Sequence, residues 1–280
     1  MLAEKTLDYK NHSIFYRVIG EGNPVVFIHG FGEDGNVWKN QIDFLKDSPP
    51  GNKTRFQLII PDLPGSGESE MIEDMSMEGM AEVIKNIIDT EFAKVSFNDG
   101  FKGTLIGHSM GGYITLAFAE KYPQYLNGLA LFPSTAFPDT EEKKLARQKG
   151  IRFIQEHGAF EFLKTSSYNL FSQLSKEKIP KLIEEFIYSL RNFKGDALVS
   201  YYEAMMRRPD RTFIIKNLQI PMLFIAGKYD NAVPLNDVLK QCHLPEISYF
   251  HVLANSGHMG MIEEAEKCNK ILNEYLINLS

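Results

Sequence analysis

Short runs of apolar residues alternate along this chain with longer segments in which apolar positions recur every three or four residues. The short runs are rich in β-branched residues and are followed by glycine- or proline-rich turns, which is typical of buried strands. The longer segments have the period of an amphipathic helix. This alternation predicts a mostly parallel sheet with helices on both faces. The predicted strands cover residues 13–19, 24–29, 56–61, 103–107, 128–132, 220–226 and 247–253.

Four segments between or after these strands are predicted to be helical. In residues 76–92, for example, Met77, Met80 and Ile84 fall on one side of a helix. A helix that begins at residue 111 is expected to stop before Pro123, because proline cannot continue a helix. The predicted helices cover residues 37–45, 76–92, 111–122 and 261–279, and the first is expected to end at residues 48–51.

The pattern changes between residues 134 and 212, where helical periods follow one another without a convincing strand. Pro180 is suited to the first turn of one of these helices, and Asp139 with Glu142 resembles a capping box that opens another. Because strands resume after this segment, it is predicted to be a helical insertion in one sheet. The predicted parts are residues 1–133 (first part of the core), 134–212 (helical cap) and 213–280 (second part of the core).

Composition excludes several classes of protein. With 280 residues, 44% of them hydrophobic and 24% charged, the chain has the composition of a folded globular protein. A net charge of -6 without a basic run argues against binding to nucleic acid. No apolar stretch is long enough for a membrane span, and residues 1–10 lack the apolar centre of a secretory signal. Two cysteines, Cys242 and Cys268, make no disulfide framework, so a cytoplasmic location is expected; oligomeric state is not readable.

One short motif carries the first sign of chemistry. Residues 107–111, Gly-His-Ser-Met-Gly, match the pattern G-x-S-x-G and lie directly between a predicted strand and a predicted helix. Small residues on both sides of the serine permit a sharp turn there. Such a turn exposes the hydroxyl of Ser109 and aims the first amides of the helix at a developing oxyanion. Ser109 is therefore the predicted nucleophile.

A serine hydroxyl is a weak nucleophile near neutral pH and needs a base that a third group holds in one tautomer. His258 and Asp230 each follow a late predicted strand, where loops at the carboxyl edge of a parallel sheet gather. Asp237 is the nearest rival of Asp230. The remaining histidines lack such a context, because they adjoin the nucleophile, shape a loop or lie within strands and helices. These histidines are His12, His29, His108, His157, His243 and His251.

Taken together, five segments resemble the successive motifs of the α/β-hydrolase superfamily, in the form of a serine hydrolase with a helical cap, similar to carboxylesterases. They are residues 29–32 (His-Gly-Phe-Gly), 61–67 (Pro-Asp-Leu-Pro-Gly-Ser-Gly), 107–112, 227–230 and 255–260. The order of these motifs is specific for the fold and much less so for the substrate. Serine at position 109 separates the chain from related dehalogenases and epoxide hydrolases, which use an aspartate nucleophile.

The resemblance implies a role for each candidate residue. Ser109 is the nucleophile, His258 the general base and Asp230 the carboxylate that orients it. The backbone amides of Phe31 and Met110 are expected to form the oxyanion hole. In the family the segment that begins at Asp62 is a structural turn beside the site. This chemistry requires no metal and no organic cofactor.

The expected reaction is hydrolysis of a small or medium, mainly apolar carboxylic ester through an acyl-enzyme on Ser109. Aromatic and methionine side chains of the cap are candidates for an apolar pocket, although their helical spacing favours core packing for most of them. They are Phe153, Phe160, Phe162, Phe171, Tyr201, Tyr202, Met205 and Met206. Relatives that cleave carbon–carbon bonds, release N-terminal proline or act as lyases share the same triad, and some ligand receptors retain it. These alternatives stay open at the level of sequence.

Overall fold

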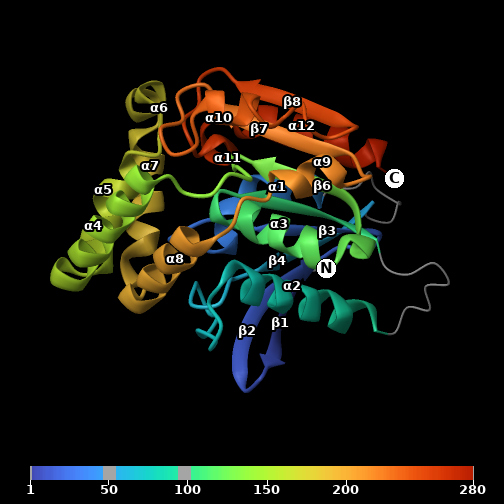
Figure 1. Cartoon of the computed structure of the whole chain (residues 1–280), viewed down its shortest axis with the longest axis horizontal. Coiled ribbons are helices and arrows are strands. Elements are labelled where there is room, and N and C mark those ends of the chain that lie inside the picture. The colour runs from blue at the N-terminus through green and yellow to red at the C-terminus, as the bar shows by residue number, and fades with distance from the viewer. Residues whose placement is uncertain (1, 47–54, 94–101, 280) are drawn as a thin grey trace.

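An eight-stranded sheet runs through the centre of the computed structural model, which describes residues 2–46, 55–93 and 102–279 (Figure 1). Its strand order is β1-β2-β4-β3-β5-β6-β7-β8. The strands are β1 (Leu2–Tyr9), β2 (His12–Ile19), β3 (Asn23–Ile28), β4 (Phe56–Pro61), β5 (Gly103–His108), β6 (Leu126–Phe132), β7 (Met222–Gly227) and β8 (Ser248–Leu253). The helix end predicted at residues 48–51 lies outside the described residues.

The six strands from β3 to β8 are parallel, and β1 and β2 join them as an antiparallel hairpin beside β4. The predicted mostly parallel sheet is therefore confirmed. Strand β1 was missing from the prediction. Its residues alternate between exposed and half-exposed and so present no apolar face that the sequence pattern reveals. Lys10 and Asn11, both with positive φ, turn the chain from β1 into β2.

Successive residues of the central strands point to opposite faces and bury two separate clusters. Val26 of β3 packs with the helices of one face, whereas Phe27 packs with Trp38 on the other. Helices on the first face are α2 (Met77–Phe92), α3 (Met110–Lys121), α9 (Thr212–Asn217) and α10 (Leu235–Leu239). Helices on the second face are α1 (Lys39–Leu45), α11 (Gly260–Glu263) and α12 (Ala265–Asn278). Short 3-10 turns are η1 (Gly35–Trp38), η2 (Pro123–Tyr125) and η3 (Leu190–Asn192).

A helical cap is inserted between β6 and β7, as predicted, and projects from the side of the sheet in Figure 1. It consists of α4 (Glu141–His157), α5 (Ala159–Tyr168), α6 (Gln173–Lys178), α7 (Pro180–Ser189) and α8 (Gly195–Arg207). Ile154, Leu163 and Leu198 form part of a small apolar cluster of its own. Its exact boundaries as a domain, 134–212, stay a prediction.

The start of α4 differs from the prediction. Thr140, not Asp139, is the N-cap, and its hydroxyl accepts a hydrogen bond from Lys143 N at 3.2 Å. The predicted capping box of Asp139 with Glu142 is wrong, because the Asp139 carboxylate is drawn to two guanidinium groups, those of Arg147 and Arg208. Pro180 does occupy the first turn of α7, as predicted.

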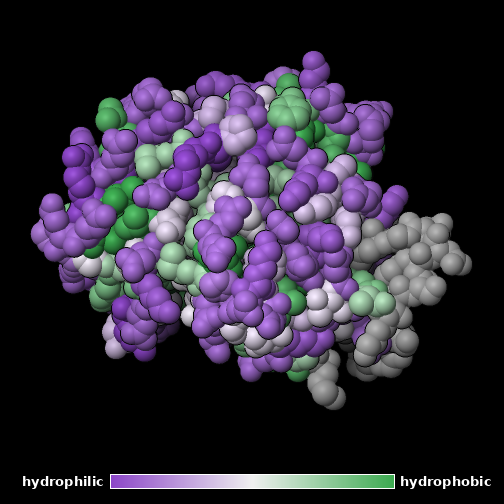
Figure 2. Space-filling view, turned by 60° about the horizontal axis from the view of Figure 1, so that its bottom comes forward, coloured by the Kyte–Doolittle hydropathy of each residue, from purple (hydrophilic) through white to green (hydrophobic). Residues whose placement is uncertain are grey.

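The molecular face in Figure 2 is largely hydrophilic, with hydrophobic residues in small separate groups. Several large apolar side chains of the cap, among them Leu145, Phe153 and Tyr188, are exposed. Across the described ranges, no helix has the length and the apolar character needed to span a bilayer.

Candidate active site

Ser109 lies at the sharp turn between β5 and α3. Its backbone has φ 50° and ψ -115°, and residues with a side chain rarely adopt a positive φ. Strain of this kind costs about 1–3 kcal/mol and persists where the surroundings enforce it. A Cβ atom on Gly107 or Gly111 would collide with backbone atoms of Gly111 or Ile28, respectively, which explains why the turn needs both glycines.

His258 and Asp230 meet at the same edge of the sheet, from the loops after β8 and β7. His258 Nδ1 lies 2.7 Å from Asp230 Oδ2, and both side chains are buried. The other carboxylate oxygen of Asp230, Oδ1, accepts hydrogen bonds from the backbone N–H groups of Ala232 (2.8 Å) and Val233 (2.9 Å). Because the carboxylate can only accept, Nδ1 of a neutral His258 carries the proton, which leaves Nε2 free as a base.

The environment of His258 favours its protonated form. Burial alone lowers the pKa of the imidazole, but the charge and the hydrogen bond of Asp230 outweigh it, aided by the charges of Glu33 and Glu263. The net result is a pKa above the ordinary value for histidine. His258 N also donates to Leu170 O of the cap at 2.7 Å, so the cap helps to hold the histidine backbone. Asp237 on α10, the rival carboxylate, instead pairs with Lys240, which directly follows that helix.

Ser109 and His258 line one cavity of about 130 Å³ between the sheet edge and the cap. Residues from the loops after β3, β7 and β8 contribute to it, together with α3, α4, α5 and α8. The lining residues are Phe31, Glu33, Ser109, Tyr113, Arg147, Ser166, Ser167, Leu170, Tyr202, Met205, Ala232, Val233 and His258. The structure thus brings the predicted nucleophile and base to the same cavity.

The two residues predicted for the oxyanion hole are Phe31, which lines this cavity, and Met110, which directly follows Ser109. Met110 is the first residue of α3, where backbone N–H groups have no partner within the helix. Phe31 lines the cavity, and its ring stacks on Tyr202 of the cap at a centroid distance of 4.3 Å. Among the described residues, none accepts a hydrogen bond from the amide of Phe31 or Met110. The amides of Phe31 and Met110 stay the predicted donors of the oxyanion hole.

Of the eight cap residues named as candidates for the pocket, Tyr202 and Met205 line the cavity. Tyr201 is buried, and its hydroxyl donates to Pro64 O at 2.6 Å. Phe171 packs in the apolar cluster of the second face of the sheet, which also contains Trp38, and Phe153 is exposed. Several of these side chains therefore pack in the protein interior, as their helical spacing indicated.

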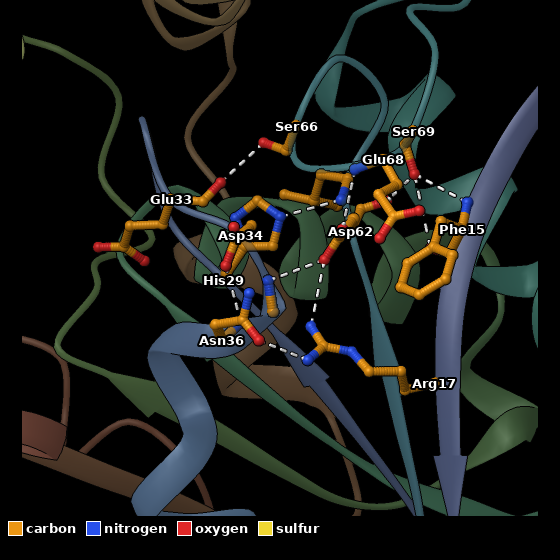
Figure 3. A network of polar contacts seen from close by, with 12 residues as sticks. Phe15, Arg17, His29, Glu33, Asp34, Asn36, Asp62, Ser66, Glu68 and Ser69 are labelled. Atoms are coloured by element: carbon orange, nitrogen blue, oxygen red, sulfur yellow. Dashed lines mark hydrogen bonds and ion pairs between the residues drawn. The ribbon is translucent and has the colours of Figure 1, made fainter. Parts of the chain in front are cut away.

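A network of polar contacts fixes the loops around the site (Figure 3). His29 is buried, and its Nε2 accepts a hydrogen bond from Leu63 N at 2.9 Å.

Asp62 accepts hydrogen bonds from Gly35 N (2.9 Å) and Glu68 N (3.1 Å), so its role is architectural, as the sequence indicated. Ser66 Oγ donates to Glu33 O at 2.8 Å. These bonds tie the loop after β3 to the loop after β4.

Two charged residues of the cavity were missed at the level of sequence. Glu33, from the loop after β3, contacts His108. Arg147, on α4, makes a two-point contact with Asp139 (Nε to Oδ2, 2.6 Å; Nη2 to Oδ1, 3.2 Å). The acidic residue directly after the His-Gly-Phe-Gly motif was a usable signal for Glu33. Arg147 lies in a helix rich in charged residues, where nothing singled it out.

Comparison with known proteins agrees with this architecture. Residues 23–265 match the family model described as the alpha/beta hydrolase fold. The chain is 23% identical to the 2-hydroxy-6-oxo-6-phenylhexa-2,4-dienoate hydrolase of Comamonas testosteroni, covering 98% of this chain and 94% of that protein.

Solved structures are similar over the same extent. A thermophilic esterase from Thermogutta terrifontis with bound malate has a TM-score of 0.87 and 27% identity, covering 100% of this chain and 99% of that one. The enol-lactonase from Burkholderia xenovorans LB400 has a TM-score of 0.84 and 19% identity, covering 98% and 100%. At that lower identity the likeness concerns the fold.

Proposed function

This chain belongs to the α/β-hydrolase family, and from that premise we propose that it is a serine hydrolase acting on a small or medium, mainly apolar carboxylic ester. Two observations support the proposal: Ser109 and His258 line the same cavity, and His258 Nδ1 lies 2.7 Å from Asp230 Oδ2. The esterase from Thermogutta terrifontis supports an ester as the substrate.

The proposed reaction proceeds in two steps. Ser109 Oγ attacks the carbonyl carbon of the ester while His258 Nε2 takes its proton. The amides of Phe31 and Met110 stabilise the negative charge that develops on the carbonyl oxygen. His258 then protonates the departing alcohol, and an acyl-enzyme on Ser109 remains. Water, deprotonated by His258, attacks the acyl carbon, and the bond to Ser109 Oγ breaks as His258 returns a proton to that oxygen. Asp230 stabilises the imidazolium in both steps.

A fluorophosphonate probe tests this proposal directly. We expect one equivalent of probe to attach to Ser109, located by peptide mass spectrometry, and to block turnover of p-nitrophenyl butyrate. A panel of ester, thioester, amide and vinylogous 1,5-diketone substrates then ranks the bonds that are cleaved. Absence of labelling, together with absence of turnover across the panel, would leave a non-enzymatic ligand receptor as the better interpretation.

The pH dependence of kcat/KM follows from the raised pKa of His258. The protonated imidazole has no lone pair on Nε2, so it cannot accept the proton of Ser109. Activity should therefore fall as pH decreases through this pKa, and the midpoint should lie above the ordinary histidine value of about 6.5. Initial rates between pH 5 and 9 at low substrate concentration measure it. A flat profile, or a midpoint below 6, contradicts the assignment.

A second candidate function, cleavage of a carbon–carbon bond in a carboxylate-bearing substrate, is favoured by Arg147. Arg147 and Arg208 share the single carboxylate of Asp139, so this cluster retains a net positive charge at the cavity wall. The relative from Comamonas testosteroni is named for a dienoate, an anionic substrate, and the esterase structure contains malate. Arg147 is therefore proposed to contact an anionic group of the substrate.

Substituting Arg147 by methionine should selectively reduce activity toward anionic substrates. A hydrogen bond to a charged group contributes about 1.5–3 kcal/mol, equivalent to roughly 10- to 100-fold in kcat/KM. We expect that loss for the p-nitrophenyl monoester of succinate and little change for neutral p-nitrophenyl butyrate. Arg207→Met, at an exposed position of α8, is the matched control and should affect neither substrate. Equal losses on both esters would contradict the proposed contact.

A further inference from the structure

Glu33 and His108 form a buried polar pair beside the proposed catalytic residues. Glu33 Oε2 lies 3.0 Å from His108 Nδ1, and the side chains are 3% and 0% exposed. The same oxygen accepts a hydrogen bond from Gly30 N at 2.7 Å. On the other side of the ring, His108 Nε2 lies 3.2 Å from the backbone oxygen of His258. Neither side chain takes part in the reaction proposed above.

The contacts fix the orientation of the His108 ring. Both ring nitrogens of His108 face oxygen atoms, and the backbone oxygen of His258 can only accept. Nε2 therefore donates to the His258 oxygen, and Nδ1 faces the Glu33 carboxylate. Burial by itself raises the pKa of Glu33, but the charge and hydrogen bond of His108 and the Gly30 N–H bring it below its usual range. An ionised Glu33 also accepts from Gly30 N most strongly.

The pair connects the three loops that the reaction needs. Gly30 precedes Phe31, whose amide is proposed for the oxyanion hole, and His108 precedes Ser109 in the chain. Through its Nε2, His108 also holds the backbone of His258. The contacts therefore run from the oxyanion loop through the neighbour of the nucleophile to the base.

We propose that the buried Glu33–His108 contact positions the loop of residues 29–32, which carries Phe31, and the loop that carries His258 relative to Ser109. This inference rests on the proposed serine-hydrolase function and makes Glu33 and His108 positioning residues. A buried polar pair with no such duty could be replaced without a specific effect on turnover. A displacement of about 1 Å in a catalytic group, in contrast, can reduce the rate by roughly 100-fold.

Glu33→Gln is the most informative substitution, because it keeps the shape and removes the charge. A neutral amide oxygen binds Gly30 N and His108 Nδ1 more weakly than the carboxylate oxygen does, so both contacts of residue 33 loosen. We expect kcat for p-nitrophenyl butyrate to fall by about 10- to 100-fold, with KM changed by less than about threefold.

A double-substitution cycle separates a linked pair from two independent residues. His108→Gln should reduce kcat to a similar extent. The variant that combines Glu33→Gln with His108→Gln should have a kcat no lower than that of the less active single variant. Independent residues would instead lose the product of both factors. Tyr275→Phe is the control for general loss of stability. Its hydroxyl bonds to Leu129 N and Pro221 O in the interior, away from the cavity, so kcat should be unchanged.

The outcomes distinguish this inference from the function on which it rests. A wild type that neither turns over esters nor reacts with the fluorophosphonate probe overturns the proposed function, and the catalytic role of the pair with it. A wild type that is active and labelled at Ser109, but whose Glu33→Gln variant retains kcat, overturns the positioning role alone. The positioning role is also overturned if Glu33→Gln reduces kcat no more than Tyr275→Phe does when the two variants have equal thermal stability.

Discussion

Replacing Ser109 by alanine is expected to reduce kcat for p-nitrophenyl butyrate by about 10⁴- to 10⁶-fold. Without the hydroxyl, no acyl-enzyme can form, and the remaining rate comes from water attacking a substrate that is bound by the oxyanion amides. The alanine keeps the Cβ that the backbone conformation of residue 109 already accommodates. The variant should therefore fold like the wild type, and its melting temperature checks this.

Ser167→Ala is the matched control for this substitution. Ser167 also lines the cavity, so its removal tests whether any serine hydroxyl there affects turnover equally. We expect its rate to stay within a few-fold of the wild type, and we expect the fluorophosphonate probe to label it fully. Probe attachment to the Ser109→Ala variant at the wild-type rate would refute the assignment of the nucleophile.

The fold was predictable because buried parallel strands are nearly continuous runs of apolar residues, which are visible in the sequence. The strand predicted at 220–226 corresponds to β7 at Met222–Gly227, which is buried along its whole length between two layers of helices. The Gly-x-Ser-x-Gly pattern located the turn after β5 because close packing at that turn admits only glycine on either side.

Exposed elements and long-range contacts were less predictable. Strand β1 lies at the edge of the sheet, and alternate residues along it are exposed to solvent. Its sequence therefore lacks the apolar run that marks a buried strand. The partners of Glu33 and Asp139 are set by tertiary packing. Glu33 and His108 are in contact although 75 positions separate them in the chain. Thr140 is the N-cap of α4, and the carboxylate of its neighbour Asp139 pairs with Arg147 and Arg208 instead.

For the site, the sequence named Ser109, Asp230 and His258 but offered no measure of how they meet. The structure adds the 2.7 Å contact between His258 and Asp230 and the shared cavity of Ser109 and His258. It also shows that Arg147 places a positive charge on a wall that was expected to be mainly apolar. The catalytic roles of the three residues stay predictions that substitution tests.

Asp230→Asn should reduce kcat by about 10⁴-fold at neutral pH. Asp230 Oδ1 accepts two backbone N–H groups, from Ala232 and Val233, so the amide oxygen of an asparagine must take that place. The NH₂ group then faces His258 Nδ1 and donates to it. The imidazole proton moves to Nε2, and the histidine cannot accept the proton of Ser109.

Asp237→Asn provides the comparison, because Asp237 lies nearby on α10 and pairs with Lys240 rather than with the histidine. That variant should retain wild-type kcat. Initial rates at pH 7.5 and the rate of labelling by the fluorophosphonate probe should decline together in Asp230→Asn, because both require an activated Ser109. If labelling persisted at the wild-type rate while ester turnover fell, Asp230 would act in a later step than activation of the nucleophile. If the losses fell on Asp237→Asn instead, the carboxylate assignment would move to that residue.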